Sequence, residues 1–301
     1  MWISRTKFIE LNAPQRSNEW YRARKRITAS TYESVLGLSM FTEQEEAINR
    51  ILGFLPPKED NPDMQAGREN EGPFRDWYSK QFNVKITEPS LCIPLTFYDF
   101  PMRWNKYRLL SEIYPKQYEY FLHPNWFIGG SPDGEIYYQD GSEANLEIKS
   151  VRYMYKPLAD YIRDKEFGFY KFKPRFVEYN DDVLTLPYKD IIKKYGFEKR
   201  GIIDNYPHIW QSHFMQMQGC MAILRKQQCV YLVGCSYRIY TETIYFDESY
   251  WRYFLFPSLV DVIENKLKPK LTDEFKKDFN EEIKCMLSCE NLNFGIIPFN
   301  I

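Results

Sequence analysis

The chain has 301 residues, of which 44% are hydrophobic and 18% aromatic, so it can bury a full core and is not a disordered polymer. Its 40 Lys and Arg balance 41 Asp and Glu, which excludes a globally basic protein and restricts any nucleic-acid contact to a local patch. No apolar run reaches the roughly 18 to 20 residues of a membrane span, and the first residues lack the apolar core of a signal peptide. We therefore expect a soluble, intracellular protein without a membrane partner.

The cysteines are dispersed along the chain without CxxC spacing, which favours free buried thiols over a disulfide framework or a zinc ribbon. They are Cys92, Cys220, Cys229, Cys235, Cys285 and Cys289. The CxxxC spacing of Cys285 and Cys289 leaves two ligands of an iron–sulfur cluster as an alternative, although the usual four-thiolate set needs closer partners.

The first part of the chain is predicted to be helical, with helices over residues 18–25, 28–38, 42–52 and 64–82. Ser17 is a typical N-cap for the first helix. Thr42 with Glu45 three residues later has the sequence of a capping box for the third. Pro73 lies within the fourth pattern, so we predict that its regular part begins there and that Glu71 stands at a helix entry or kink.

The middle of the chain predicts strands over residues 84–87, 127–130, 135–138 and 146–151. The turn Ser131–Gly134 between the second and third strands indicates a β-meander. A long helix over 204–224, strands over 229–235 and 239–246, and a last helix over 247–266 follow. This order predicts a mixed α/β fold with a central sheet flanked by helices.

Two long segments, about 94–125 and 151–200, do not fit these elements, and we interpret them as insertions. Residues 151–200 hold 12 Lys or Arg, 8 Asp or Glu and 12 aromatics. Such a segment either stacks unpaired bases and lines a DNA groove or is a plain surface subdomain. We predict a single domain over 1–270 and a C-terminal extension of unknown role over 271–301.

Asp133, Glu147 and Lys149 form the pattern with the clearest chemistry. Side chains alternate along a strand, so Glu147 and Lys149 project from the same face, and Asp133 in the preceding turn can fold against it. Two converging carboxylates suit Mg²⁺ or Mn²⁺ better than Zn²⁺, and a lysine beside them can orient or deprotonate an attacking water. The alternative is an acidic turn residue and a charge pair on an exposed strand.

Five motifs in order resemble the PD-(D/E)XK nuclease superfamily, and within it the lambda-exonuclease-like, YqaJ-type viral recombinases. They are Trp20 with Arg24 and Ile27–Ser30 (W…R…ITAS), Gly67–Glu71 (GxxxE), Ser131–Gly134 (SPDG), Glu147–Lys149 (EIK), and Gln216 with Gln218 (QxQ). They cover about residues 17–250. The resemblance implies a restriction-endonuclease-like α/β core with a mixed central sheet, here carrying insertions.

The resemblance also implies site residues. Asp133, Glu147 and the Ile148 backbone carbonyl would hold a divalent metal, Mg²⁺ or in its place Mn²⁺, and Glu71 would complete the set. Lys149 would act on the attacking water. Gln216 would position water or the scissile phosphate, and Gln218 is the weaker candidate of the pair.

Arg24 and Ser30 match the pocket that holds a DNA 5′-phosphate in this family, with Trp20 supporting it. A serine hydroxyl, the free N–H groups of a helix start and a forked arginine are good phosphate ligands in general. Ser30 as a plain N-cap beside a solvated basic helix face is the alternative.

The chain departs from the family pattern at His213, where relatives often carry tyrosine, and a histidine on an apolar helix face is typical of the core. A catalytic base at His213 is the weaker interpretation, because Lys149 fills that role. The segment 151–200 is longer than in compact relatives and puts the family's ring trimer in question, so monomer and trimer both remain open.

We therefore predict a metal-dependent deoxyribonuclease that degrades linear double-stranded DNA from the 5′ end in recombination, repair or viral DNA processing. The alternatives are a structure-selective endonuclease, an alkaline nuclease that also cuts RNA, and a DNA-binding recombination module without activity. The expected partners are double-stranded DNA ends and a single-strand-annealing protein, and in a viral setting the site of action would be the host cytoplasm or nucleus.

Overall fold

The computed structural model describes residues 2–5, 8–57, 59, 61–94, 96–98, 124–150, 209–235, 238–289 and 295–297. The predicted insertion 151–200 lies outside the described residues, and so does most of 94–125. Among the described residues, no helix has both the length and the apolar character needed to cross a membrane.

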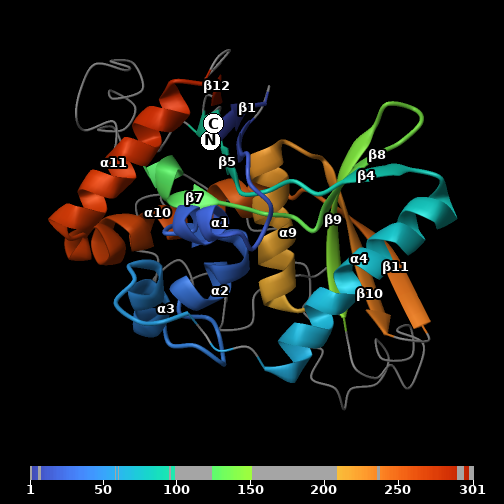
Figure 1. Cartoon of the computed structure of the whole chain (residues 1–301), viewed down its shortest axis with the longest axis horizontal. Helices are drawn as coiled ribbons and strands as arrows, with labels where there is room; N and C mark the ends of the chain where they lie inside the picture. The colour runs from blue at the N-terminus through green and yellow to red at the C-terminus, as the bar shows by residue number, and fades with distance from the viewer. Residues whose placement is uncertain are drawn as a thin grey trace.

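A five-stranded sheet forms one half of the described fold (Figure 1). Its order is β11 (Arg238–Tyr245), β10 (Gln228–Cys235), β9 (Glu143–Ser150), β8 (Gly134–Tyr137) and β4 (Lys85–Thr87). The β9–β10 pair is parallel and the other pairs are antiparallel. The predicted mixed α/β fold with a mixed central sheet is confirmed.

Two helices, α4 (Pro62–Phe82) and α9 (Gln211–Leu224), cover opposite faces of this sheet. Phe74 of α4 packs in one hydrophobic cluster with Leu146 and Ile148 of β9. Because side chains alternate along β9, Glu147 and Lys149 face the other side, toward α9. The charged motif therefore lies in the layer between sheet and helix.

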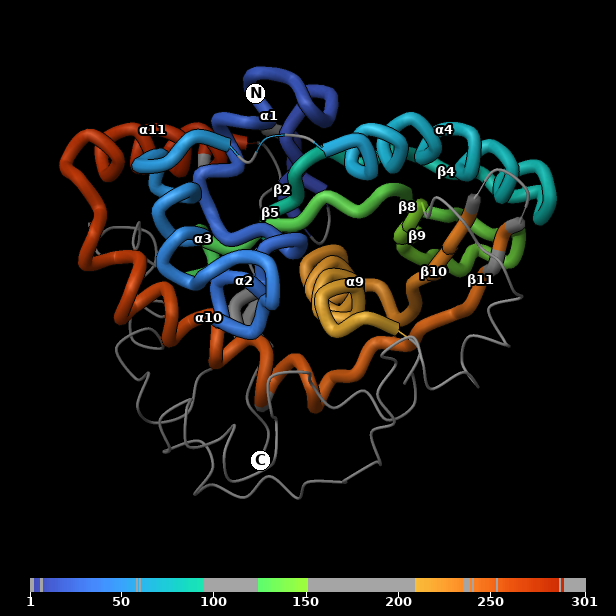
Figure 2. The backbone as a smooth tube through the Cα atoms, turned by 90° about the horizontal axis from the view of Figure 1, so that it is seen from below, coloured from blue at the N-terminus to red at the C-terminus, as the bar shows by residue number. Residues whose placement is uncertain are grey.

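The N-terminal part packs beside α9 rather than joining the central sheet (Figure 2). It contains β1 (Trp2–Ser4), β2 (Phe8–Leu11), α1 (Asn18–Ala23), β3 (Ile27–Thr28), η1 (Ala29–Thr31), α2 (Tyr32–Val35), α3 (Gln44–Ile51) and β5 (Cys92–Pro94). Gly219 lets α2 approach α9 closely, since a Cβ at this position would stand 2.3 Å from the Tyr32 ring. This packing joins the N-terminal motif residues to the α9 side of the sheet.

The C-terminal helices complete the main hydrophobic core. Consecutive helical segments run through η6 (Tyr250–Leu255), α10 (Phe256–Val262), η7 (Ile263–Leu267) and η8 (Lys268–Lys270), of which η6 and η7 are π-helical. Helix α11 (Asp273–Leu287) buries Phe275, Phe279 and Ile283 in the same cluster as Ile27. The domain boundary at residue 270 stays a prediction, although this extension contributes to the core.

The predicted four-strand meander is wrong at its second strand. Residues 124–127 form a 3₁₀ turn, η4 (Pro124–Phe127), and β7 (Ile128–Gly129) pairs in parallel with β3. A separate two-stranded sheet joins β6 (Thr96–Tyr98) to β12 (Gly295–Ile297). Pairings across about 100 residues or more leave no local pattern, which is why the sequence did not reveal them.

Three helix boundaries also differ from the predictions. Helix α3 is preceded by Glu43 rather than capped by Thr42, and the Gln44 amide donates instead to the Val35 carbonyl at 2.6 Å. The predicted helix over 28–38 shortens to η1 and α2 because Ile27–Thr28 pairs as a strand. Helix α4 runs unbroken through Pro73, which is exposed, so Glu71 lies within the helix.

The other predicted elements agree more closely with the structure. Ser17 caps α1, with its hydroxyl accepting from the Trp20 N–H at 3.2 Å. Strands β4, β8, β9, β10 and β11 fall within a few residues of their predicted bounds. Helix α9 begins at Gln211 rather than 204, and residues 204–208 lie outside the described part.

Candidate active site

Strand β9 and the turn before β8 bring Asp133, Glu147 and Lys149 together, as predicted. The Asp133 Oδ2 accepts a hydrogen bond from the Ile148 N–H at 2.7 Å, which fixes this carboxylate against β9. The Lys149 ammonium is ion-paired with the Glu147 Oε1 and is 24% exposed, whereas Glu147 is 1% exposed. The other oxygen of Glu147, Oε2, is buried without a hydrogen-bond partner among the described residues.

The two carboxylates are held in an environment that disfavours their charge. Burial raises the pKa of Asp133 well above its ordinary value, and the charge of Glu147 raises it further. Burial also raises the pKa of Glu147, although Lys149 acts against this. The single positive charge of Lys149 does not balance the two negative charges of these desolvated carboxylates. The carboxylate oxygens, one of them without a partner among the described residues, therefore fit an additional cation.

Lys149 is charged in this arrangement. Burial by itself lowers its pKa, but the neighbouring charges of Glu147 and Asp133 outweigh burial and raise the pKa above its ordinary value. Its Nζ also donates to the Gln216 Oε1 of α9 at 3.3 Å. The structure thus places Gln216 beside the lysine, at the α9 wall of the site.

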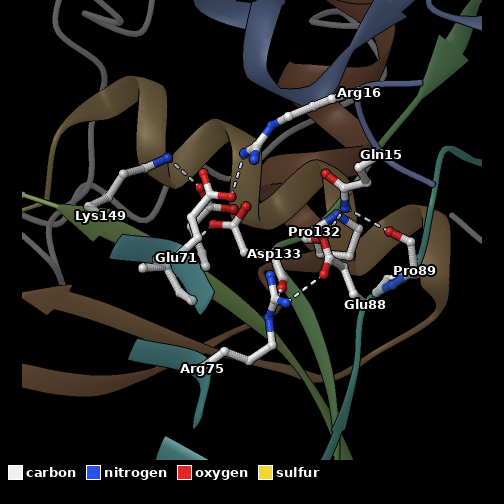
Figure 3. A network of polar contacts seen from close by, with 11 residues as sticks. Gln15, Arg16, Glu71, Arg75, Glu88, Pro89, Pro132, Asp133 and Lys149 are labelled. Atoms are coloured by element: carbon white, nitrogen blue, oxygen red, sulfur yellow. Dashed lines mark hydrogen bonds and ion pairs between the residues drawn. The ribbon is translucent and has the colours of Figure 1, made fainter. Parts of the chain in front are cut away.

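Glu71 lies on α4 beside these groups but is directed to another partner. Its charge contributes to raising the pKa of Asp133 and of Glu147, so it is within electrostatic range of both. Its Oε2 forms an ion pair with the Arg16 Nη2 at 2.5 Å (Figure 3). In the described part of the chain, no three acidic, histidine or cysteine side chains converge closely enough to hold a metal ion.

The two remaining α9 candidates differ: Gln218 faces away from the site, whereas His213 lies within electrostatic range of Lys149. Gln218 is fully buried, and its amide donates to the Tyr245 carbonyl at 2.9 Å while its Oε1 accepts from the Asp247 N–H at 2.8 Å. These bonds hold α9 to the end of β11, so the structure does not bring Gln218 into the site. His213 Nδ1 shares a 2.9 Å hydrogen bond with the Tyr231 hydroxyl. Burial lowers the pKa of His213 well below its ordinary value, which leaves the ring neutral.

A second polar group, Arg24 with Thr28 and Ser30, lies at the start of the N-terminal helices. The Arg24 Nη2 donates to the Thr28 Oγ1 at 3.0 Å and to the Ser30 Oγ at 3.1 Å. Its guanidinium stacks 4.2 Å above the centre of the Trp20 ring. Burial lowers the pKa of Arg24 to about 10, and no carboxylate among the described residues lies within ion-pair distance of it. An arginine held by hydroxyls and an aromatic ring suits an anion, so we call this group the candidate anion site.

Trp20 connects the two groups. Its indole Nε1 donates to the Ser131 hydroxyl at 3.2 Å, two residues before Asp133. The Cys220 thiol of α9 lies within electrostatic range of both groups. Its pKa is raised chiefly by burial, raised further by Glu147 and Asp133, and lowered by Lys149 and Arg24. The anion site and the carboxylate site are therefore neighbours on one side of α9.

Three residues of this region escaped the sequence analysis as site residues. The Gln15 amide donates to the carbonyls of Pro89 and Pro132 at 2.7 and 3.2 Å, and the Arg75 Nε donates to the Asp133 carbonyl at 2.9 Å (Figure 3). Both side chains hold the turn that carries Asp133. The third is Arg16, the partner of Glu71. No spacing rule links these residues to the SPDG turn.

Residues 19–170 match the YqaJ-like viral recombinase domain, and this match covers half of the chain. The chain belongs to this family. The match includes the W…R…ITAS, GxxxE, SPDG and EIK motifs, and membership supports a nuclease role for the chain. Among the curated proteins, no significant match is found.

Solved structures with similarity to this chain include two exonucleases. An alkaline exonuclease of Laribacter hongkongensis, LHK-Exo, is 17% identical, with 90% of this chain and 96% of that chain covered and a TM-score of 0.41. A phage-related exonuclease from Haemophilus somnus 129PT is 13% identical over 87% of this chain and 96% of that chain, with a TM-score of 0.38. These values are too low to support a functional inference.

Proposed function

We propose that this protein is a metal-dependent deoxyribonuclease that shortens linear duplex DNA from its 5′ ends. The observation that carries the proposal is the pair of desolvated carboxylates, Asp133 and Glu147. One buried oxygen of Glu147, beside Lys149, has no hydrogen-bond partner within the described part of the chain. A buried carboxylate oxygen without a donor is costly unless a ligand supplies the missing charge. Family membership supports DNA as the substrate.

Asp133 and Glu147 would hold Mg²⁺ or Mn²⁺, together with the backbone carbonyl of Ile148, which follows Glu147 in sequence. When bound, the cation supplies positive charge to the scissile phosphate and lowers the pKa of the attacking water. Glu71 is the candidate to complete the set once it is released from Arg16. Hard oxygen ligands of this kind favour these ions over Zn²⁺.

Lys149 is the candidate to take the proton from the attacking water. Burial by itself lowers its pKa, and the pKa is raised chiefly because two carboxylates lie beside it. When the carboxylate charges are neutralised, burial prevails and the lysine gives up its proton more readily. Gln216, whose Oε1 accepts from the Lys149 Nζ, would orient the neutral amino group toward the attacking water.

The preference for 5′ ends rests on the Arg24 site. A terminal phosphate carries more negative charge than an internal phosphodiester, and Arg24 with Ser30 offers a forked cation and a hydroxyl that no carboxylate of the described residues occupies. The hydrogen bond from Trp20 to Ser131 connects this site to the turn of Asp133. An end held at Arg24 would lie beside the carboxylates that carry out hydrolysis.

The proposal extends to assembly. Removing the 5′ strand leaves a single-stranded 3′ tail, and we propose a single-strand-annealing protein as the partner that receives it. Light scattering of the purified protein distinguishes a monomer from a ring trimer.

The test compares linear with covalently closed duplex DNA, each with Mg²⁺ or with EDTA, and with either 5′-phosphate or 5′-hydroxyl ends. The proposal predicts metal-dependent loss of linear DNA only, fastest from 5′-phosphate ends. Equal cutting of closed circles would identify an endonuclease, and loss of an RNA substrate an activity on transcripts. DNA binding without any cleavage would favour a recombination module.

A further inference from the structure

Among the described residues, Arg16 is a charged side chain beside the carboxylate site to which the proposed function gives no role. Its Nη2 is paired with the Glu71 Oε2 at 2.5 Å, and its side chain is 39% exposed (Figure 3). A guanidinium has five N–H donors, and this ion pair uses only part of them. Arg16 therefore contacts an acidic residue of the candidate site and is at the same time accessible from the solvent.

The backbone at Arg16 is held in an uncommon conformation. Its φ is 68°, in the left-handed region that non-glycine residues rarely occupy. The adjacent Gln15 fixes the loop by donating to the Pro89 and Pro132 carbonyls. Because Pro132 precedes Asp133, the loop that carries Arg16 is tied to the turn that carries a catalytic carboxylate. The side chain is thus presented to the site by a constrained loop.

Arg16 and a cation would compete for the same carboxylate. Glu71 lies close enough to raise the pKa of Asp133 and Glu147, yet its oxygens do not converge with theirs while Arg16 holds it. If Glu71 is to join the cation, the ion pair with Arg16 must open. The freed guanidinium then needs another anion, and a DNA strand at this site supplies phosphodiester groups, for which arginine is a suitable ligand.

We propose that Arg16 exchanges partners on substrate binding, leaving Glu71 for a phosphodiester of the DNA strand and releasing Glu71 to the divalent cation. This inference rests on the proposed function. It assigns Arg16 as a substrate-contacting residue that couples DNA binding to completion of the cation site. Such coupling is reciprocal, so bound DNA tightens cation binding and bound cation tightens DNA binding.

The test uses Arg16→Gly, since glycine accepts a φ of 68° without strain and the loop is expected to fold. Arg22→Ala removes an exposed arginine of α1 that has no ion pair to the site and is the matched control. Calorimetry measures Mn²⁺ binding to the DNA-free protein. Binding to 5′-phosphorylated duplex is measured against salt in the Lys149→Ala background, where the DNA stays intact.

Arg16→Gly is expected to bind Mn²⁺ about tenfold more tightly without DNA, because Glu71 loses its competitor. The same change is expected to weaken DNA binding and to lower the slope of log affinity against log salt by about one phosphate contact. Arg22→Ala leaves Mn²⁺ affinity unchanged. A residue with a purely structural role would weaken both bindings together, so opposite signs support the exchange.

Unchanged or weaker Mn²⁺ binding by Arg16→Gly would overturn the proposal. Tighter Mn²⁺ binding with an unchanged salt slope would overturn the claim that Arg16 contacts a phosphodiester of the DNA. Asp133→Asn separates this inference from the proposed function. If Asp133→Asn leaves Mn²⁺ binding intact, the cation site itself is wrong. If Asp133→Asn abolishes Mn²⁺ binding and Arg16→Gly does not alter it, only the partner exchange fails.

Discussion

Two buried charged groups in this protein are built in opposite ways. The Arg26 side chain is fully buried, and its guanidinium donates to the Ala23 and Trp126 carbonyls and to both carboxylate oxygens of Glu282. Glu147 is equally buried, but one of its oxygens has no partner among the described residues. Extensive hydrogen bonding marks the first group as structural, and the missing partner of the second is the observation on which the proposed cation site rests.

The surroundings of the two groups reinforce this difference. Arg26 lies 5.1 Å above the Phe279 ring, which itself stacks on Phe127 at 4.5 Å, so the charge is enclosed by aromatic packing. Around Glu147, by contrast, two further acidic side chains, Asp133 and Glu71, lie within electrostatic range, together with Lys149 and the Arg16 partner of Glu71. Like charges brought together under desolvation destabilise the free protein, a cost that proteins commonly carry at functional sites.

The largest effect on activity is expected at Lys149. Lys149→Ala removes the proton acceptor and should lower DNA cleavage by about 10³-fold, within the range of general acid–base catalysis. Lys85→Ala, at an exposed position of β4 in the same sheet, is the control. Single-turnover cleavage with saturating Mg²⁺ measures both. Near-normal hydrolysis by Lys149→Ala would remove the lysine from the mechanism.

On the structural side of the comparison, Glu282→Ala should destabilise the fold by about 3–5 kcal/mol, because it removes the carboxylate that is ion-paired with the buried Arg26. Asp278→Ala, on the same helix and 4.0 Å from the exposed Lys25, should change stability by less than about 0.5 kcal/mol. Urea unfolding provides both values. Equal effects of the two variants would contradict the structural role of the Arg26 group.

Arg24 tests whether the anion site recognises DNA ends. Arg24→Ala should reduce the preference for 5′-phosphate over 5′-hydroxyl ends by about tenfold or more, since a hydrogen bond to a charged group contributes about 1.5–3 kcal/mol. Arg22→Ala should leave the preference unchanged. The ratio of kcat/KM for the two substrates is the measurement, and an unaltered ratio in Arg24→Ala would make this arginine a structural residue.

The smallest effects are expected for two glutamines of α9, one on the cleavage rate and the other on stability. Gln216→Leu should slow cleavage by about tenfold without altering stability, because its partner is Lys149. Gln218→Leu should cost about 1–3 kcal/mol of stability, because it removes the hydrogen bonds of this side chain to the Tyr245 carbonyl and the Asp247 N–H. The rate per folded molecule should stay near normal in Gln218→Leu. A reversed pattern would exchange the roles of the two side chains.

The site was predictable where its residues are local in sequence. Glu147 and Lys149 share a face because of strand alternation, and the SPDG turn places Asp133 next to that strand. Gln15 and Arg16 come from a loop more than 110 residues before Asp133, and no periodicity connects them to it. Chain folding, rather than local pattern, brings these residues to the turn.

The fold, too, was predictable only where its elements have a local sequence pattern. Strands β8 to β11 follow from alternation and turn residues, whereas the β3–β7 pair joins Ile27 to Ile128 and has no local signal. Pro73 was expected to begin the regular part of a helix, but an exposed proline within 21 residues of continuous helix is tolerated. Glu71 therefore lies in the middle of α4, and the position of this helix determines how close Glu71 is to Asp133.

The most direct test of the account is thermal unfolding of the wild-type protein and Asp133→Asn between pH 5 and 8, with and without Mg²⁺. Burial raises the pKa of Asp133, so the folded, cation-free protein holds this proton more tightly than the unfolded chain. Its stability should therefore fall as the pH rises above about 4, where a free Asp carboxyl ionises.

Mg²⁺ should raise the melting temperature of the wild-type protein, and this increase should grow with pH because the cation replaces the proton. Asp133→Asn, which lacks the ionisable carboxyl, should melt higher than wild type without Mg²⁺ and respond little to its addition. Equal responses of the two proteins to Mg²⁺ at every pH would contradict a cation site at Asp133 and Glu147.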